Sequence, residues 1–581
     1  MIGDLILRKD NAWLKFTGPR RVIVTEKLDE VRNSLEEVER LVNENGWTAA
    51  GFVSYEASPA FDHALRVISS KDGFPLLWFG LYETSETIDS LEDYGTLLPL
   101  EWRPDIDREA YNNAIQSIKN QIAQGKTYQV NYTMRLSTDI KAYQQSEIDL
   151  QALQLFRHLT HSQNKYAAFL DIGNWAICSA SHELFFDLDN DTITGRPMKG
   201  TIKRGRTTDE DTHTQNWLRA SSKNRAENVM IVDMIRNDIG RIADLGSVHV
   251  PELFTIEKYP TLFQMTSTVK GKTKASVAEI FANLFPCASI TGAPKVSTMN
   301  IIADLETSSR NIYCGSIGYI APGRKARFNV AIRTALVDKK NRKAEYGIGG
   351  GIVWDSTSAD EYSEALLKAQ VLTSPPQKEF SLFETVLWTP EEGYFLIDRH
   401  IARIIDSANY FGFKTENLKE NFLKALNAIS PKGNSSKRIK ISLNSEGFIT
   451  TEIKDFQPSA KVFQVCLAKE PVNSMDRFLF HKTTNREVYE KAAITGFDDV
   501  LLYNEKDELT EFMIGNLVAK IDGMLFTPPV ECGLLAGTFR AELVASGEVK
   551  ERVIKIQDWA EFEAVFLINS LRKWVKVKIS K

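Results

Sequence analysis

A double proline near residue 375 constrains the fold of this chain more than any other feature. Residues 361–372 have the apolar spacing of an amphipathic helix, and residues 373–378 then read Thr-Ser-Pro-Pro-Gln-Lys. Because proline cannot continue a helix and a double proline stiffens the chain, this stretch predicts a short linker. A strand pattern follows at 380–387. The expected organisation is a large unit over 1–373, a linker over 374–378 and a smaller unit over 379–581.

The bulk composition excludes several functional classes. The 581 residues carry a net charge of −5 that is spread along the chain, so the electrostatic footprint of a nucleic-acid-binding protein is missing. No stretch approaches the ~18 apolar residues of a membrane span. The five cysteines are scattered without a C-x-x-C pair, which is typical of a reducing compartment. We therefore expect a cytoplasmic protein that binds neither nucleic acid nor membrane.

The first unit mixes helix and strand patterns without strict alternation. Apolar residues recur at helical spacing in 111–124 and 226–243, whereas 128–136 alternates like a strand. Further strands are expected at 328–337 and at 346–354, which is rich in glycine. This pattern predicts an α+β fold. A dinucleotide fold is not expected, because no G-x-G-x-x-G loop joins a strand to a helix.

The most informative motif is at residues 197–201, which read Pro-Met-Lys-Gly-Thr. We expect Lys199 to lie on a tight turn flanked by glycine, between a strand at 181–188 and a charged run. A lysine amine becomes a covalent nucleophile when a pocket of low dielectric constant lowers its pKa. Taken alone, the motif fits a solvated turn lysine equally well.

Further motifs extend this signal from about residue 100 to 370. They lie at 128–131, 181–185, 225–233, 291–295, 313–315, 331–333, 349–351 and 360–364. Their order resembles that of the chorismate-binding enzymes. Within that family, residues 197–201 resemble the P-I-K-G-T signature of aminodeoxychorismate synthases, whereas anthranilate synthases usually carry alanine in place of the lysine. The resemblance implies an anthranilate synthase-like fold and an enzyme that aminates chorismate.

The resemblance also implies catalytic roles. Lys199 would attack the ring of chorismate while Glu183 protonates the departing hydroxyl, and ammonia would then displace the lysine. Isochorismate and salicylate synthases carry a lysine that activates water at the position of Gln129, so glutamine disfavours water as the nucleophile. Arg333, expected in mid-strand among apolar neighbours, needs an anionic partner. The implied substrate-binding residues are Thr201, Ser289, Tyr313, Arg333, Gly349, Gly351 and Lys368.

Three glutamates predict a magnesium site. Glu227 lies on one expected helix, and Glu361 and Glu364 lie three residues apart, hence on one face, of another. Mg²⁺ takes few protein oxygens and keeps positions for substrate and water. By resemblance, Glu227 and Glu364 are direct or water-bridged ligands and Glu361 supports them. A solvated helix face is the alternative explanation for such a glutamate pair.

The second unit resembles the class IV pyridoxal-phosphate family, which includes branched-chain aminotransferases and aminodeoxychorismate lyase. The matching motifs lie at 382–385, 399–404, 481–486, 509–511, 533–540 and 569–572. The resemblance implies a smaller fold-type IV α+β domain that binds pyridoxal 5'-phosphate. Between about 380 and 575 this unit is shorter than typical members of the family.

Physical roles follow for two of the implied cofactor residues and for one loop. Lys482 would bind the cofactor aldehyde and act as the catalytic base, and Glu511 would pair with the pyridinium nitrogen. The loop at 533–538 precedes a helix pattern, whose first N–H groups suit a phosphate. The implied cofactor-binding residues are Arg403, Lys482, Glu511, Asn516, Leu535, Thr538 and Ser570.

Together, the two resemblances predict a bifunctional fusion for folate synthesis. One unit would convert chorismate and ammonia to 4-amino-4-deoxychorismate, and the other would cleave this to 4-aminobenzoate and pyruvate. No Gly-x-Cys-x-Gly nucleophile turn occurs, so we expect a separate glutamine amidotransferase subunit. Class IV relatives often dimerise, so a homodimer is a further expectation. The alternatives are an anthranilate synthase-like subunit fused to an aminotransferase or to a non-catalytic module.

Overall fold

The structure, a computed structural model, describes residues 3–70, 73–142, 144–161, 165–374, 379–429, 431, 434–457 and 461–580. The contacts among its residues divide the chain into two compact units. Unit 1 comprises Met1–Ile202 and Trp217–Pro376, and unit 2 comprises Lys203–Asn216 and Gln377–Lys581. A continuous first domain was expected over 1–373, whereas the contacts in the structure group Lys203–Asn216 with unit 2. The expected linker at 374–378 lies outside the described residues except for Ser374.

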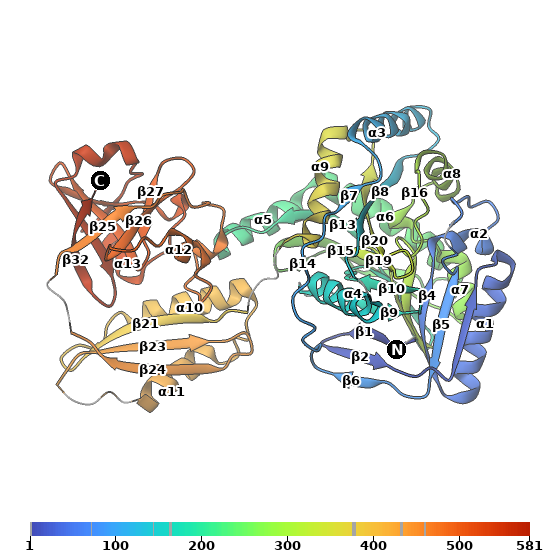
Figure 1. Cartoon of the computed structure of the whole chain (residues 1–581), viewed down its shortest axis with the longest axis horizontal. Coiled ribbons are helices and arrows are strands. Elements are labelled where there is room, and N and C mark those ends of the chain that lie inside the picture. Colours follow the sequence, from blue (N-terminus) through green and yellow to red (C-terminus); the bar gives the residue numbers. More distant parts are fainter. Residues whose placement is uncertain are drawn as a thin grey trace. The chain divides into compact units, whose positions relative to one another are not determined.

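Unit 1 contains two large antiparallel sheets (Figure 1). The strand order of the first is β16 (Gly292–Ala293), β8 (Gln129–Asp139), β20 (Lys343–Ile352), β19 (Thr334–Asp338), β10 (Trp175–Ser179), β9 (Ala168–Asp171), β1 (Leu5–Lys9), β2 (Ala12–Phe16) and β6 (Glu86–Ile88), with β7 (Arg103–Pro104) paired to β8. The order of the second is β13 (Met198–Lys203), β15 (Leu262–Lys272), β12 (Thr192–Arg196), β11 (Leu184–Asp189), β18 (Lys325–Asn329), β17 (Ser316–Ala321), β4 (Thr48–Val53), β5 (Leu77–Tyr82) and β3 (Arg21–Thr25), with β14 (His249–Lys258) paired to β15.

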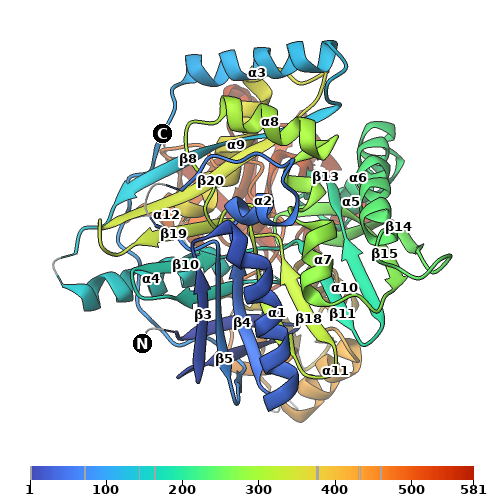
Figure 2. The ribbon, with the colours of Figure 1, turned by 90° about the vertical axis from the view of Figure 1, so that its right-hand side faces the viewer.

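The buried side chains show that the two sheets pack face to face with helices outside. Strand β5 illustrates this, because Leu77 and Phe79 point to the helix-covered core whereas Trp78 and Tyr82 enter the core shared with β1 and β9. Helix α1 lies along β3, β4 and β5 (Figure 2). The helices against the second sheet are α1 (Leu28–Asn45), α2 (Ser58–Phe61), α6 (Ser222–Gly240) and α7 (Val277–Leu284). Those against the first sheet are α3 (Arg108–Ala123), α4 (Gln145–Thr160), α8 (Lys295–Leu305) and α9 (Ser358–Ala369).

Two local expectations for unit 1 are wrong. The strand expected at 328–337 is interrupted, because β18 ends at Asn329 and β19 begins at Thr334. Arg333 lies in that interruption with φ +53°, so it is not a mid-strand residue. The turn expected around Lys199 is instead strand β13, in which Gly200 takes φ +93°. Glycine adopts this left-handed backbone without strain, so the strand bends where a turn was expected.

Unit 2 has two sheets of different kinds. An antiparallel sheet in the order β22 (Gly393–Tyr394), β21 (Leu382–Thr389), β23 (Lys437–Leu443) and β24 (Ile449–Asp455) packs against α10 (Ile397–Phe411) and α11 (Leu418–Ile429). The other runs β27 (Leu509–Phe512), β26 (Asp499–Tyr503), β25 (Phe463–Leu467), β32 (Lys573–Ser580), β31 (Ala564–Asn569), β28 (Gly515–Ile521), β29 (Met524–Thr527) and β30 (Lys550–Glu551). Because β27 also pairs with β28, this sheet closes on itself around a core that contains Val465, Leu509 and Leu567.

Three further helices complete the list for the described residues: α5 (Thr208–Ala220), α12 (Glu487–Ala492) and α13 (Thr538–Ala545). Helix α13 follows the loop that was expected to bind phosphate, and helix α12 follows Lys482. None of the helices in the described part of the chain combines the length and apolarity needed to cross a bilayer.

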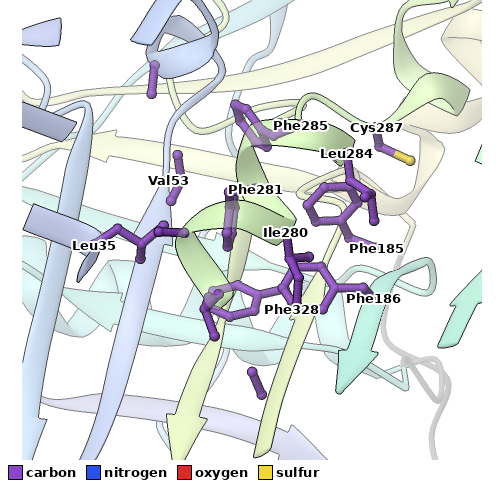
Figure 3. Packing of buried hydrophobic residues seen from close by; sticks show 14 of the residues in the cluster. Leu35, Val53, Phe185, Phe186, Ile280, Phe281, Leu284, Phe285, Cys287 and Phe328 are labelled. Carbon is purple, nitrogen blue, oxygen red and sulfur yellow. The ribbon is translucent and has the colours of Figure 1, made fainter. Parts of the chain in front are cut away.

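An aromatic cluster anchors α7 to the second sheet of unit 1 (Figure 3). The Phe281 ring is fully buried and lies 5.0 Å from the ring of Phe328, 5.6 Å from that of Phe186 and 5.8 Å from that of Phe185. The contact with Phe328 is edge-to-face, the arrangement that aromatic quadrupoles prefer. Phe185 lies two residues after the expected acid Glu183, so this packing fixes the start of β11 beside the candidate site.

We expect Phe281→Ala to destabilise unit 1 by about 3–5 kcal/mol, because it leaves a cavity that the surrounding rings cannot fill. The matched control is Leu245→Ala, since Leu245 is fully exposed. Differential scanning calorimetry of both variants measures the effect. An unchanged transition in the Phe281 variant would contradict the assignment of this cluster as the core of the unit.

Candidate active sites

The Lys199 amine lies against the backbone of strand β20 in unit 1. A Cβ atom at Gly351 would lie 3.1 Å from Lys199 Nζ and 2.3 Å from Gln129 Nε2. Any larger residue at 351 would therefore displace both side chains. Gln129 is fully buried, and neither polar atom of its amide has a hydrogen-bond partner among the described residues. The glycine strand thus brings the amine and an unsatisfied amide to one point.

Burial lowers the pKa of Lys199, and the neighbouring Lys368 acts in the same direction. Carboxylates oppose this effect, with Glu227 the strongest of them, followed by Glu183 and Glu364. A lysine amine that loses its proton more readily is available as a nucleophile. The structure thus gives Lys199 the environment that its proposed chemistry needs.

Glu183 immediately precedes strand β11 and is buried. Burial raises the pKa of its carboxyl group to about 7, although a hydrogen bond with Ser289 and the charge of Lys199 both favour the anion. Ser289 lies on the short helix Ala288–Ile290 and its hydroxyl is 3.2 Å from Cys287 Sγ. Glu183 Oε1 has no hydrogen-bond partner in the described structure. A carboxyl group that keeps its proton near neutral pH can act as an acid.

Lys368 connects helix α9 to the glycine strand. Its amine donates to the Gly349 carbonyl at 2.8 Å and pairs with Glu364 at 2.9 Å. The Arg333 guanidinium donates to the Lys368 carbonyl at 2.6 Å. A Cβ atom at Gly350 would lie 3.0 Å from Glu361 Oε2. Arg333 is therefore held by a backbone carbonyl, and within the described residues no carboxylate forms an ion pair with it.

The other expected substrate residues lie in distinct surroundings. Thr201 Oγ1 donates to Gln264 Oε1 at 2.9 Å on the neighbouring strand β15. The buried Tyr313 ring packs on Gly347 and lies 5.1 Å from the Arg135 guanidinium. The structure joins Lys199, Glu183, Gly351 and Lys368 through contacts or electrostatic coupling. The roles of these four residues, like those of Thr201 and Tyr313, stay predictions.

The three glutamates expected to bind magnesium have different partners. Glu361 accepts from the Ser356 hydroxyl at 2.6 Å, Glu364 pairs with Lys368, and Glu227 acts electrostatically on Lys199. Across the described residues, no group of three or more His, Cys, Asp or Glu side chains is arranged as a metal cage. Mg²⁺ commonly uses one or two carboxylates together with substrate and water. Glu227 and Glu364, which both act on Lys199, fit that mode of binding.

In unit 2, Lys482 lies between the short helix Arg477–Leu479 and α12. Its backbone carbonyl accepts from Phe383 N at 3.0 Å, and its amine lies 4.8 Å from the centre of the Phe383 ring. Burial, followed by the positive charge of Arg403, lowers the pKa of Lys482 to about 8. This amine is therefore much easier to deprotonate than an exposed lysine.

Glu511 on β27 is held by three donors. Its Oε1 accepts from the Tyr489 hydroxyl at 2.8 Å and from Leu535 N at 3.1 Å, and its Oε2 accepts from Asn516 Nδ2 at 3.2 Å. Asn516 faces Glu511 across the β27–β28 pairing. Burial raises the pKa of Glu511 to about 7 despite these hydrogen bonds. A cation beside this carboxylate would relieve the cost of burying its charge.

A buried ion cluster connects α10 to the loop before α13. Glu384 accepts from Arg403 and from His400, both at 2.6 Å through Oε2. Burial alone would raise the pKa of Glu384, but Arg403 and His400 hold it at about 2. His400 Nε2 lies 3.4 Å from Thr538 Oγ1, and Arg403 donates to the Ala536 carbonyl at 3.1 Å. Glu384 on β21 thus holds the loop before α13 in place through Arg403 and His400.

This arrangement suits pyridoxal 5'-phosphate. Thr538 opens α13, where free N–H groups attract an anion, and Asn516 Nδ2 donates to the Leu535 carbonyl at 2.8 Å. At Gly537 a Cβ atom would lie 2.0 Å from Asn516 Oδ1, so the loop can pack here only with glycine. Ser570 is buried directly after β31. The amine of Lys482, the carboxylate of Glu511 and this loop form a donor set that fits the cofactor.

Sequence reasoning missed two residues that organise unit 2. The motif at 382–385 includes Glu384 without marking it as a site residue, and no motif includes Tyr489. An acidic residue within the apolar pattern of a strand at 382–387 was the available signal for Glu384. The contact between Tyr489 and Glu511 joins residues 22 positions apart. Without the fold, the sequence contains no signal for this pair.

Comparisons with known proteins agree with these two sites. The family described as chorismate binding enzyme matches residues 5–374, which is more than half of the chain. The chain belongs to the chorismate binding enzyme family. A second family, described as amino-transferase class IV, matches residues 381–579. Both predicted resemblances are therefore confirmed.

Curated relatives match part of this chain. The "Aminodeoxychorismate synthase, chloroplastic" of Arabidopsis thaliana is 39% identical over 294 residues, which are 50% of this chain and 30% of the relative. The "Aminodeoxychorismate synthase component 1" of Escherichia coli (strain K12) is 36% identical over 297 residues, which are 51% of this chain and 63% of the relative. The chain thus spans less than two thirds of the length of either relative.

A solved structure supports the fold expected for the first part. Anthranilate synthase component I from Streptococcus pneumoniae TIGR4 superimposes with a TM-score of 0.54 at 23% identity, over 64% of this chain and 92% of that chain. At this identity the likeness concerns the fold alone. The expected anthranilate synthase-like fold, followed by a class IV domain, is confirmed by this match and the two family matches.

We expect competitive labelling of the cofactor-free protein to give Lys482 a pKa near 8, because burial and Arg403 disfavour its charged form. Trace acetic anhydride between pH 6 and 11, followed by peptide mass spectrometry, measures the reactivity of each lysine. Lys419, an exposed lysine on α11, is the internal control. A Lys482 pKa equal to that of Lys419 would contradict the buried position of its amine.

Proposed function

We propose that unit 1 aminates chorismate to 4-amino-4-deoxychorismate and that unit 2 cleaves this product to 4-aminobenzoate and pyruvate. The observation that carries the proposal is the position of Lys199 in the signature at 197–201, with its amine against Gly351 and within electrostatic reach of Glu183. An alanine at 199, as in anthranilate synthases, would remove this nucleophile.

The proposed amination has two displacements. In the first, Lys199 Nζ bonds to a ring carbon, the electrons of the ring double bonds shift, and the C4–O bond breaks. Glu183 gives its proton to the departing hydroxyl, so water leaves. In the second, ammonia bonds to C4, the electrons shift back, and the bond to Lys199 breaks. The amine of Lys199 and the carboxyl group of Glu183 are then restored by proton transfer.

Cations and a metal would hold the two carboxylates of chorismate. We assign Arg333, Tyr313 and the backbone N–H groups at Gly349 and Gly351 to one carboxylate, with Lys368 as support. Glu227 and Glu364 would bind Mg²⁺, which would supply positive charge for the other carboxylate. Glu361 would assist through its position beside Gly350. These assignments agree with the contacts of Lys368 to Gly349 and Glu364.

In unit 2, pyridoxal 5'-phosphate when bound would supply the electron sink for breaking bonds at the carbon that bears nitrogen. We assign to Lys482 the removal of the proton from that carbon, which its lowered pKa supports. Glu511 would hold the pyridine nitrogen protonated. Arg403, Thr538 and Ser570 would surround the phosphate, with Asn516 and the Leu535 backbone fixing the loop.

This function implies a partner and a cellular setting. Ammonia has to come from solution or from a separate glutamine amidotransferase subunit, which we propose as the partner. A homodimer through the class IV part and a cytoplasmic location also belong to the proposal. The product would serve folate synthesis.

One competing function concerns unit 2. Class IV members include aminotransferases, which use the same lysine and cofactor, so unit 2 could transfer an amino group instead of releasing pyruvate. The contacts of Lys482 and Glu511 suit both reactions. Product analysis separates them.

The decisive experiment incubates the purified protein with chorismate, Mg²⁺, pyridoxal 5'-phosphate and a high concentration of ammonium, and separates the products. We expect 4-aminobenzoate and pyruvate in equal amounts. Lys482→Ala should accumulate 4-amino-4-deoxychorismate, and Lys199→Ala should not form it by this route. Anthranilate from the native protein would refute the assignment of unit 1, and accumulation of the intermediate by the native protein would refute the lyase assignment.

Deprotonation of Glu183 near pH 7 should oppose amination as pH rises, because Glu183 acts as an acid only while it is protonated. Deprotonation of Lys199, the proposed nucleophile, acts in the opposite direction. Measurements at a constant concentration of free ammonia isolate this dependence, with saturating chorismate between pH 6 and 9. Glu183→Gln should lower kcat by about 100-fold or more and remove the contribution of the Glu183 ionisation to the pH profile, so that the rate rises more steeply with pH than in the native protein. A pH profile of the same shape in the native protein and in Glu183→Gln would exclude Glu183 as the acid.

A further inference from the structure

The segment Lys203–Asn216 belongs to unit 2 although residues of unit 1 precede and follow it in the sequence. It begins with the last residue of β13, the strand that carries Lys199. The chain consequently passes between the two units three times, at residues 202–203, 216–217 and 376–377. A chain with two consecutive domains joined by one linker passes between them only once.

Arg204 is the central anchor of this segment. The side chain is buried, forms an ion pair with Asp211, and donates to the Tyr410 carbonyl at 2.7 Å. Its guanidinium lies 4.0 Å from the centre of the Tyr410 ring, and the Tyr410 hydroxyl donates to the Gly205 carbonyl at 2.7 Å. A buried arginine is tolerated only with such a complete set of partners. The segment and α10 thus satisfy each other's polar groups.

Arg206 is a second anchor and contacts two loops of unit 2. Its guanidinium donates to the carbonyls of Ser474 at 3.1 Å and Glu531 at 3.2 Å. Its position is fixed by Glu210 and by the Phe480 ring, whose centre is 4.8 Å away. The first loop leads to Lys482, and the second leads to the residues assigned to the phosphate of the cofactor. The Arg206 side chain therefore connects the loop that leads to Lys482 with the loop that leads to the phosphate-binding residues.

The third contact reaches the neighbour of Lys482. His481 Nε2 lies 3.1 Å from the Arg206 carbonyl, which can only accept, so this nitrogen carries the proton. In the neutral ring Nδ1 then accepts from the Ser407 hydroxyl at 2.9 Å. The imidazole also stacks on the Tyr410 ring at 4.2 Å. These contacts fix the imidazole, and with it the backbone from which the Lys482 side chain leaves.

We propose that Lys203–Asn216 is a positioning element of the second active site, which holds His481 and thereby directs the Lys482 amine. The proposal rests on the function assigned to Lys482. Arg204 and Arg206 are its positioning residues, and neither takes part in bond making. The activity of unit 2 then depends on residues encoded within the sequence of the chorismate-binding part, and a cut at 374–378 does not release a complete second enzyme.

The first test replaces residues 375–378 of the full-length protein with the recognition sequence of a specific protease. After cleavage, the two fragments should elute together in gel filtration at about 1 µM, where only complexes with a Kd below that value persist. The double variant Arg204→Ala, Arg206→Ala should separate. Arg219→Ala, which changes an exposed arginine at the end of α5, is the matched control. Elution that is the same for the native protein and the double variant would overturn the proposal.

The second test measures the pKa of Lys482 by competitive labelling of the uncut, cofactor-free protein. Arg204→Ala should raise this pKa by about one unit toward that of an exposed lysine, because water enters beside a loosened loop. Tyr410→Phe, which keeps the ring but loses the bond to Gly205, should cause a smaller rise. A fall in Tm with no change in this pKa would mean a purely structural role and would overturn the proposal.

Neither readout requires bound cofactor or turnover. If unit 2 lacks lyase activity but the fragments elute together and the pKa of Lys482 responds to Arg204→Ala, the proposed function fails while the positioning role stands. If lyase activity is present in the native protein and unaffected in the double variant, the positioning role fails while the proposed function stands.

Discussion

Both sites depend on the same constraint, which is that a lysine amine must be held where its charge is disfavoured. In unit 1 the glycine strand β20 achieves this, since the absence of a side chain at Gly351 lets Lys199 and Gln129 approach the backbone. In unit 2 the burial of Lys482 is reinforced by the positive charge of Arg403. Carboxyl groups whose own pKa values are raised by burial, Glu183 and Glu511, complete the two sites. Burial therefore brings the pKa values of the amine and the carboxyl group closer together in each pair.

Different interactions support the Lys199–Glu183 pair and the Lys482–Glu511 pair. In unit 1 the support is hydrophobic packing, because the aromatic cluster around Phe281 packs against the strand that follows Glu183. Unit 2 uses charge, because Glu384 binds Arg403 and His400 and so shapes the loop before α13. A hydrophobic cluster loses stability gradually when atoms are removed, whereas a buried ion cluster leaves an unpaired charge when one member is lost. The second site should therefore be less tolerant of substitution in the residues that support Lys482 and Glu511.

The sequence predicted the elements with strong periodicity, including α3, α6 and β8, because an apolar face of a helix or strand repeats regularly. It also supplied the two family resemblances and the candidate residues Lys199, Glu183, Lys482 and Glu511. It failed where distant parts of the chain decide the conformation. The strand expected at 328–337 breaks at Arg333, which a backbone carbonyl of α9 holds, and Lys203–Asn216 belongs with a unit that begins more than 150 residues later. Local patterns contain no information about such partners.

The lowered pKa of Lys482 affects the evolution of this sequence through the stability of the folded protein. Since the native pKa is about 8 and the unfolded value about 10.5, folding at neutral pH carries a penalty of up to about 3 kcal/mol from this side chain. The penalty is full below pH 8, shrinks between 8 and 10.5 and vanishes above. An apolar side chain of similar length, such as methionine, would remove it. Selection for stability alone would therefore favour replacement of Lys482 by an apolar residue, and only selection for the chemistry of its amine retains the lysine.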